Sequence, residues 1–255
     1  MRRGLAAVLL CLLVASAGCS VIPGGSDGDD GTTAEEVPGV EDGRLANESA
    51  LLDAHIEATT ETGYSYERRA NVTDAVGGEP INVSERQRTR VEAGASEYWI
   101  QQITTAAGSS RVTAWGNESL ELRRIERPGQ DPQVRVGESR PPGELAARAV
   151  FEPRLSPEFE VVDVEQREDA PDIVTLEVDG MPEENEVFAG QENVENVRGF
   201  EAQLVVDTEG RIHSYAAAAV YDIEGETANY DFSYQMTSFE DPGVERPEWA
   251  AEGDG

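Results

Sequence analysis

The stretch TANYDFSYQMTSF, residues 227–239, carries the clearest structural pattern in this chain. Every second side chain on it is apolar or aromatic, namely Ala228, Tyr230, Phe232, Tyr234 and Met236, and the side chains between them are mostly polar. Successive side chains of a strand point to opposite faces of a sheet, so this alternation predicts a strand with one buried face and one face in water. An antiparallel sheet is therefore expected around it.

The same period of two recurs along most of the chain after Tyr64. Turn pairs such as Gly77-Gly78 and Glu209-Gly210 separate the runs, which favours hairpins between neighbouring strands. The predicted strands are Tyr64–Thr73, Ile81–Glu92, Glu97–Thr105, Arg111–Trp115, Leu120–Glu126, Gln133–Val136, Phe159–Glu165, Ile173–Val178, Phe200–Asp207, Ile212–Ile223 and Thr227–Phe239. Together they predict a long antiparallel sheet.

Three segments depart from this alternation and predict helices. In the first, apolar residues recur at helical spacing between Leu45 and Thr59, Asn47 or Ser49 is placed to cap the start, and Gly63 ends it.

The second predicted helix is Pro142–Leu155, with Leu145, Ala149 and Val150 on one side. The third segment, Pro182–Val197, is predicted to be a helix or helical loop. Strands interrupted by helices of this kind indicate an α+β fold.

The first 19 residues have the three parts of an export signal: Arg2 and Arg3, an apolar run over 4–14, and small residues before Cys19. The apolar run is too short for a permanent membrane helix, which needs about 20 residues. Cys19 after Ala-Gly resembles a lipobox, the processing site of prokaryotic lipoproteins. The resemblance implies a signal peptide over 1–18 and a diacylglyceryl group on Cys19, which would hold the protein on the extracytoplasmic face of the membrane. An ordinary secretory signal with a chance cysteine is the alternative, and the arginine pair leaves open whether export is by the general or the twin-arginine route.

Behind the signal, composition divides the chain into three parts. Residues 19–43 are rich in Gly, Asp and Pro and are expected to be an acidic disordered tether. Residues 44–250 suit a single α+β domain, and 251–255 a disordered tail.

The charge balance is strongly acidic. The sequence has 51 acidic residues against 20 basic ones, all of them arginine, and a formal net charge of −31. Salt at 1 M reduces the screening length to about 3 Å, so such a surface suits concentrated salt, and the composition resembles that of haloarchaeal proteins. Nucleic acid is not expected as a partner, because the arginines form no basic stripe.

Residues for catalysis are scarce. Cys11 would leave with the signal and Cys19 would be acylated, so no thiol remains for a disulfide, a metal or a nucleophile. His55 and His213 are the two histidines, and no nucleophile elbow, phosphate loop, dinucleotide fingerprint or metalloprotease helix occurs. We therefore expect no enzyme activity, no cofactor and no metal site.

The aromatic stripe is the best candidate for a ligand-facing surface. Alanines in a neighbouring strand leave room for a ligand or a packed helix to approach the sheet. The candidate ligand-binding residues are Tyr98, Ile100, Trp115, Ala216, Ala218, Tyr230, Phe232, Tyr234 and Met236. An ordinary core covered by the protein's own helices is the alternative.

Four Asn-X-Ser/Thr sequons are candidate glycosylation sites on an exported protein: Asn47, Asn71, Asn82 and Asn117.

The order of helix, antiparallel meander, helical interruption and closing hairpin resembles the LolA-like fold, which includes periplasmic lipoprotein carriers and mycobacterial lipid-binding lipoproteins. More narrowly, the chain resembles a family of haloarchaeal lipoproteins. The residues that carry this resemblance are the lipobox at Cys19, the acidic tether, Leu51–Arg69, Val205–Tyr215 and Val244–Ala250. It implies a curved antiparallel sheet, an incomplete β-barrel, with helices covering its concave face and acyl chains held between them.

The expected function is therefore that of a monomeric, membrane-anchored lipoprotein that binds or carries a lipid or other hydrophobic ligand between sheet and helices. A cell-surface structural or interaction lipoprotein with a solid core is the alternative. An enzyme would need His55 or His213 beside a serine and a carboxylate within about 3 Å.

Overall fold

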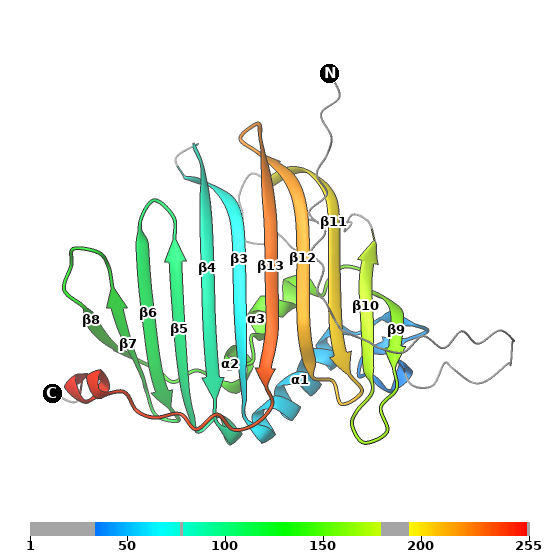
Figure 1. The fold of residues 1–255 in the computed structure, drawn as a ribbon, viewed down its shortest axis with the longest axis horizontal. Helices are drawn as coiled ribbons and strands as arrows, with labels where there is room; N and C mark the ends of the chain where they lie inside the picture. The colour runs from blue at the N-terminus through cyan, green and yellow to red at the C-terminus, as the bar shows by residue number, and fades with distance from the viewer. Residues whose placement is uncertain (1–33, 77–78, 180–193, 254–255) are drawn as a thin grey trace, which may run out of the picture. The chain divides into compact units, whose positions relative to one another are not determined.

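The sheet is built around the stretch 227–239. The computed structural model describes residues 34–76, 79–179 and 194–253, which form 13 strands of one open antiparallel sheet (Figure 1). The signal, Cys19, residues 20–33 of the expected tether, most of the third predicted helix and residues 254–255 lie outside the described residues. No described helix is long and apolar enough to cross a membrane.

Strand β13 (Glu226–Ser238) lies in the middle of the sheet, between β12 (Ile212–Ile223) and β3 (Tyr64–Val76). Tyr234 is opposite Tyr215 on one side and Arg68 on the other. The pairing of β13 with β3 joins the end of the chain to its beginning, a contact that local pattern cannot predict.

Two runs of strands extend from this centre. Beyond β3 follow β4 (Glu79–Val91), β5 (Glu97–Thr105), β6 (Ser109–Asn117), β7 (Glu121–Glu126) and β8 (Gln133–Gly137). Beyond β12 follow β11 (Val194–Asp207), β10 (Ile173–Asp179), β9 (Glu160–Glu165), β2 (Arg44–Leu45) and β1 (Val40–Glu41). The predicted strands are confirmed, with ends that differ by a few residues. The exception is β11, which begins six residues earlier than predicted, so Val194–Val197 is strand rather than helix because it pairs with the end of β12.

Helix α1 (Glu48–Thr62) confirms the first predicted helix, including both ends. The Asn47 side chain accepts a hydrogen bond from the Ala50 N–H, and Gly63 closes the helix at a φ of 75°. The Gly63 N–H donates to the Thr59 carbonyl, which satisfies one of the free acceptors in the last turn.

The second predicted helix is broken into α2 (Pro142–Leu145), α3 (Arg148–Phe151) and the 3₁₀ turn η3 (Glu152–Arg154). The break is at Ala147, whose φ is +64°. Leu145 and Phe151 would lie about 120° apart around a continuous helix, yet both are fully buried here. The prediction of one continuous helix was therefore wrong, because the left-handed residue lets both side chains reach the same core; Ala149 is exposed.

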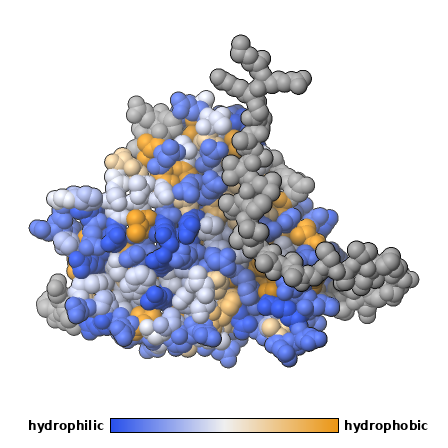
Figure 2. Space-filling view, viewed as in Figure 1, coloured by the Kyte–Doolittle hydropathy of each residue, from blue (hydrophilic) through white to orange (hydrophobic). Residues whose placement is uncertain are grey.

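The helices lie against one face of the sheet, which we call the helix-side face. Leu51 and Leu52 of α1 and Phe151 of α3 belong to one core with the buried residues of β3, β12 and β13, and Figure 1 shows α1, α2 and α3 crossing behind these strands. The opposite side is the outer face. It is turned to the viewer in Figure 2 and is mostly hydrophilic, as expected from the exposed residues that alternate along β13.

Residues 34–43, expected to belong to the tether, are part of the folded core. Ala34, Val37 and Val40 are buried in it. The Gly39 carbonyl accepts hydrogen bonds from the backbone of Ala46 and Asn47. The expected boundary at Gly43 was wrong because the few apolar residues of this acidic stretch are sufficient to anchor it to the main core. The remaining short 3₁₀ turns are η1 (Ala34–Glu36), η2 (Ala93–Ala95) and η5 (Glu248–Gly253).

Candidate functional site

The predicted aromatic stripe lies on the helix-side face of β13. Tyr230, Phe232, Tyr234 and Met236 are each less than a tenth exposed, whereas the residues between them are exposed. Tyr98 and Ile100 of β5 are buried in the same core. Six of the nine predicted ligand-binding residues are thus brought to one face, although their role in binding stays a prediction.

Ala216 and Ala218 lie on the outer face instead. Directly opposite residues of an antiparallel pair share a face, and Ala217 and Ala219 are the ones opposite Phe232 and Tyr230. Ala217 and Ala219 are buried, and Ala216 is exposed. The prediction took the wrong members of the alanine run, because a run of identical residues does not indicate which of its two faces is buried.

Trp115 also lies on the outer face. It is opposite Trp99 in the β5–β6 pair, whereas its neighbours Ala114 and Gly116 are opposite Ile100 and Tyr98. Trp115 is buried there in a second, smaller apolar cluster with Leu122, Val244 and Ala250. The sheet is therefore covered on both faces at this point, and aromatic character alone does not show which core a side chain enters.

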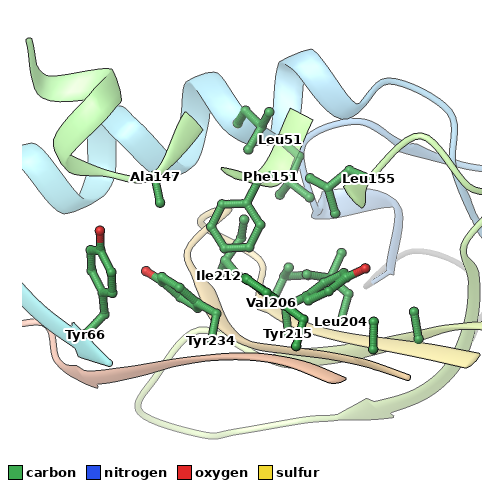
Figure 3. Packing of buried hydrophobic residues seen from close by; sticks show 14 of the residues in the cluster. Leu51, Tyr66, Ala147, Phe151, Leu155, Leu204, Val206, Ile212, Tyr215 and Tyr234 are labelled. Carbon is green, nitrogen blue, oxygen red and sulfur yellow. The ribbon is translucent and has the colours of Figure 1, made fainter. Parts of the chain in front are cut away.

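Several residues of the site were not predicted. Tyr64 and Tyr66 of β3, Tyr215 of β12 and Phe151 of α3 complete the layer between sheet and helices. Figure 3 shows Phe151 reaching down from α3 above Tyr234; the ring centroids are 4.8 Å apart and the rings are nearly perpendicular. The Tyr66 ring lies 4.8 Å from Tyr234 on the other side. The alternation of tyrosines in GYSY indicated this face at Tyr64 and Tyr66, but no local pattern indicated Phe151.

Three polar atoms inside this layer have no hydrogen-bond partner among the described residues: the hydroxyl oxygens of Tyr64 and Tyr234 and Nε2 of His55. Their side chains are at most 1 % exposed. Burial raises the pKa of both tyrosines well above the ordinary value, and the neighbouring Tyr66 raises both further. Buried polar groups are nearly always paired, so these three stand out.

The Tyr66 hydroxyl, by contrast, accepts a hydrogen bond from Gln87 Nε2 at 3.0 Å. This bond belongs to a polar network on the same face. Arg68 contacts Glu85 and donates to Gln87, and Gln102 donates to Glu85. The network lies where the apolar layer gives way to half-buried polar side chains.

Arg154 lies over the stripe from the helix side. Its guanidinium carbon is 4.0 Å from the centroid of Phe232, and its Nε donates to the Tyr230 hydroxyl at 3.1 Å. A cation above an aromatic face is attracted by the ring's negative centre. Residues 76 positions apart in the chain thus meet at this point.

The two histidines are used in other ways. His55 is fully buried, and its Nδ1 accepts the backbone N–H of Ile212 at 3.1 Å. His213 Nε2 is 2.9 Å from Asp207 Oδ2, beside the β11–β12 turn whose N–H groups at Glu209 and Arg211 donate to the same carboxylate. Among the described residues neither histidine side chain is hydrogen-bonded to a serine, and no group of His, Cys, Asp and Glu suits a metal ion.

A surface pocket of about 470 Å³ lies beside the β1–β2 turn and the start of β9. It is lined by Glu41, Asp42, Arg44, Leu45, Ala46, Glu158 and Phe159. Four of its seven lining residues are charged, and the lining residue Phe159 packs against Tyr215 of the aromatic layer with ring centroids 6.3 Å apart.

Three of the sequon asparagines, Asn47, Asn71 and Asn82, are exposed, and Asn117 is half-buried. Asn71-Val72-Thr73 and Asn82-Val83-Ser84 lie directly opposite each other, since Asn71 pairs with Ser84 and Thr73 with Asn82. The Asn117 side chain accepts hydrogen bonds from the N–H groups of Ser119 and Leu120. Glycosylation at all four stays a prediction.

No family model matches the sequence, and no match was found among the curated proteins. Several solved structures are similar. A DUF1329 family protein from Desulfovibrio piger is 12% identical, with a TM-score of 0.29, over 77% of this chain and 94% of that chain. A LolA superfamily protein from Nitrosomonas europaea is 10% identical, with a TM-score of 0.23, over 78% of this chain and 94% of the other.

A β-barrel-like protein of the domain of unknown function DUF1849 from Brucella abortus is 6% identical, with a TM-score of 0.26, over 70% of this chain and 100% of that one. These TM-scores are too low to assign the chain to a family.

Proposed function

We propose that this protein binds a hydrophobic ligand between the helix-side face of the sheet and the segment α2–η3. The observation that carries the proposal is an aromatic layer with three buried polar atoms that have no partner in the described part of the chain, next to a helix broken at Ala147. A ligand with an apolar body and a polar group suits both features.

The energetics favour an occupant. Each buried polar group without a partner costs roughly 1–3 kcal/mol, and a hydroxyl or carbonyl of a ligand would relieve this cost at Tyr64, Tyr234 or His55. The aromatic side chains offer the apolar surface that ligand pockets usually have.

For a ligand to enter, we propose that α2–η3 moves, because Leu145 and Phe151 of this segment are fully buried. Helices of four residues have little stability of their own. This segment is held on the sheet by the packing of Leu145 and Phe151 and by the hydrogen bonds of Arg154 with Tyr230 and Tyr215. We propose that a ligand replaces Phe151 against Tyr234.

We propose that the protein binds its ligand on the outside of the cell membrane. There the chain would be cleaved after Gly18 and anchored by acylation of Cys19, and it would act as a monomer in concentrated salt. In this proposal the sheet curves around the helices as in LolA-like proteins, and the relation to haloarchaeal lipoproteins holds. The proposed role is binding without catalysis.

A second candidate function is a cell-surface interaction protein with a solid core. The close ring contacts of Phe151 favour it. Its partner surface would then lie on the exterior.

Organic extraction of the full chain, purified from its native membrane in concentrated KCl, tests the proposal. Mass spectrometry should find an apolar molecule in near-stoichiometric amount, and the emptied protein should bind dodecanol. A protein that is purified empty and also fails to bind dodecanol would contradict the proposed ligand binding and favour the interaction protein with a solid core.

A pair of variants locates the binding. Phe151→Leu makes the side chain that the ligand must displace smaller, and should therefore tighten dodecanol binding. Val162→Ala, at a side chain that is 54% exposed, should leave dodecanol binding unchanged. Equal affinities in both variants would place the binding elsewhere.

A further inference from the structure

Arg154 is held in one orientation on the helix-side face. Its Nη1 donates to the Val150 carbonyl at 2.6 Å, its Nε donates to the Tyr230 hydroxyl, and its own carbonyl accepts from the Tyr215 hydroxyl at 3.3 Å. The half-buried guanidinium therefore cannot easily turn toward solvent, and it stays above Phe232.

This arginine has no acidic partner within 4.0 Å among the described residues, although the chain has 51 acidic residues and 20 arginines. Its Nη2 has no hydrogen-bond partner there either. Other arginines nearby are paired: Arg68 on the same face with Glu85, and Arg148 with Asp53 and Glu152. In so acidic a chain, a half-buried guanidinium without a carboxylate is a positive charge left available.

Two arginines act on the Tyr230 hydroxyl. Burial raises the pKa of Tyr230, and Arg154 and Arg68 both oppose that rise, so both guanidinium groups act on its hydroxyl. Glu85 is the carboxylate that contacts Arg68. Arg154 donates to Tyr230 at this end of the stripe, whereas Met236 lies at the other end.

We infer that the ligand is an anionic amphiphile whose carboxylate or phosphate head group binds Arg154 while its chain lies along Phe232, Tyr234 and Met236. This inference rests on the proposed binding between sheet and helices. The planar guanidinium suits either oxyanion, since its N–H donors match the spacing of their oxygens. The net charge of −31 does not prevent an anion from binding in concentrated salt, because repulsion from carboxylates more than about 3 Å away is screened at 1 M. The charge nearest to the head group, that of Arg154, then dominates its interaction with the protein.

Three probes with the same chain test it on the full-length protein in concentrated KCl: dodecanoate, dodecyl phosphate and the uncharged dodecanol. Wild type should bind at least one of the anions about tenfold or more tightly than dodecanol, as a charged hydrogen bond provides. Whichever anion binds more tightly identifies the head group as a carboxylate or a phosphate.

Variants then test whether Arg154 causes the preference for an anion over dodecanol. Arg154→Gln should reduce the ratio of anion affinity to dodecanol affinity to about one, and Arg154→Lys should keep part of this preference. Arg198→Gln, at an exposed ion pair with Asp222, should keep it fully. A wild type without preference, or an Arg154→Gln variant that keeps it, would overturn the inference and leave the hydrophobic site in place. A wild type that binds none of the three probes would instead overturn the proposed function.

Discussion

At the scale of single residues, His55 contributes a hydrogen bond rather than a charge to the interior. It is fully buried on α1, accepts the N–H of Ile212, and packs edge-on against Phe151 with ring centroids 6.0 Å apart. Burial lowers the pKa of His55 from 6.5 to about 3, with Asp207 acting in the opposite direction. Only the neutral imidazole is therefore compatible with the folded core at ordinary pH.

This pKa predicts a loss of stability in mild acid. The unfolded chain binds a proton at His55 as pH falls through 6.5, and the folded chain does so only near pH 3, so the stability contributed by neutral His55 is full above 6.5 and falls as pH decreases toward 3. Between pH 7 and pH 5 the loss should be about 2 kcal/mol.

Denaturant unfolding of wild type and His55→Asn at both pH values measures the loss. The asparagine oxygen can accept the same N–H without titrating, so the free-energy difference between the two proteins should shrink by about 2 kcal/mol at pH 5. A difference that does not change with pH would show that His55 is not buried in its neutral form.

Two neighbouring tyrosines should respond in opposite ways to loss of their hydroxyls. Tyr64→Phe removes a buried hydroxyl that has no partner among residues 34–76, 79–179 and 194–253, and should leave stability unchanged or raise it by about 1 kcal/mol. Tyr66→Phe removes the acceptor of Gln87 and should lower stability by about 1 kcal/mol. Urea unfolding of both variants checks the signs. A clear loss of stability in Tyr64→Phe would mean that its hydroxyl is satisfied by a bound molecule.

At the scale of elements, the β5–β6 pair depends on one close approach. A Cβ added at Gly116 would lie 2.3 Å from Cζ of Tyr98 and 2.4 Å from its hydroxyl oxygen. That oxygen is 3.2 Å from Glu121 and accepts the N–H of Arg140, and the ring is fully buried. Tyr98 therefore has no room to move away from a larger residue at this position.

Gly116→Ala should accordingly destabilise the protein by about 2–3 kcal/mol through overpacking. Gly108→Ala is the matched control in the preceding turn, where an added Cβ meets nothing within 4 Å, and it should change stability by less than about 0.5 kcal/mol. Thermal unfolding of both variants under the same conditions makes the comparison. Equal stability of the two would show that Tyr98 does not pack against Gly116.

At the scale of the whole molecule, charge sets the conditions of folding. With 51 acidic residues against 20 arginines, the exposed carboxylates repel one another wherever no arginine lies between them. At Glu67 on the outer face this repulsion is offset locally, because its carboxylate forms ion pairs with Arg86 and Arg88.

The unfolding temperature should therefore rise steeply with KCl from low concentration to about 1 M, where the screening length falls to about 3 Å. Sucrose of equal osmolality is the control, because it is excluded from the protein surface but does not screen charge. An equal rise in sucrose would mean that repulsion is not what limits stability.

Much of the local structure followed from the sequence. The alternation in residues 227–239 predicted β13 and its buried face, and Asn47 and Gly63 marked the ends of α1, because side-chain period and capping act over a few neighbouring residues. The break at Ala147, the folding of residues 34–43 and the strand at Val194–Val197 were missed, because each depends on packing against distant residues.

By itself, the sequence determined which residues alternate, where the first helix begins and ends, and how acidic the surface is. Only the tertiary structure decided that Trp115 and Ala216 lie on the outer face, that Phe151 enters the aromatic layer, and that Arg154 meets Tyr230. The reason is physical. Period two separates the two faces of one strand, but which face becomes buried depends on the strands and helices that pack beside it, and these come from remote parts of the chain.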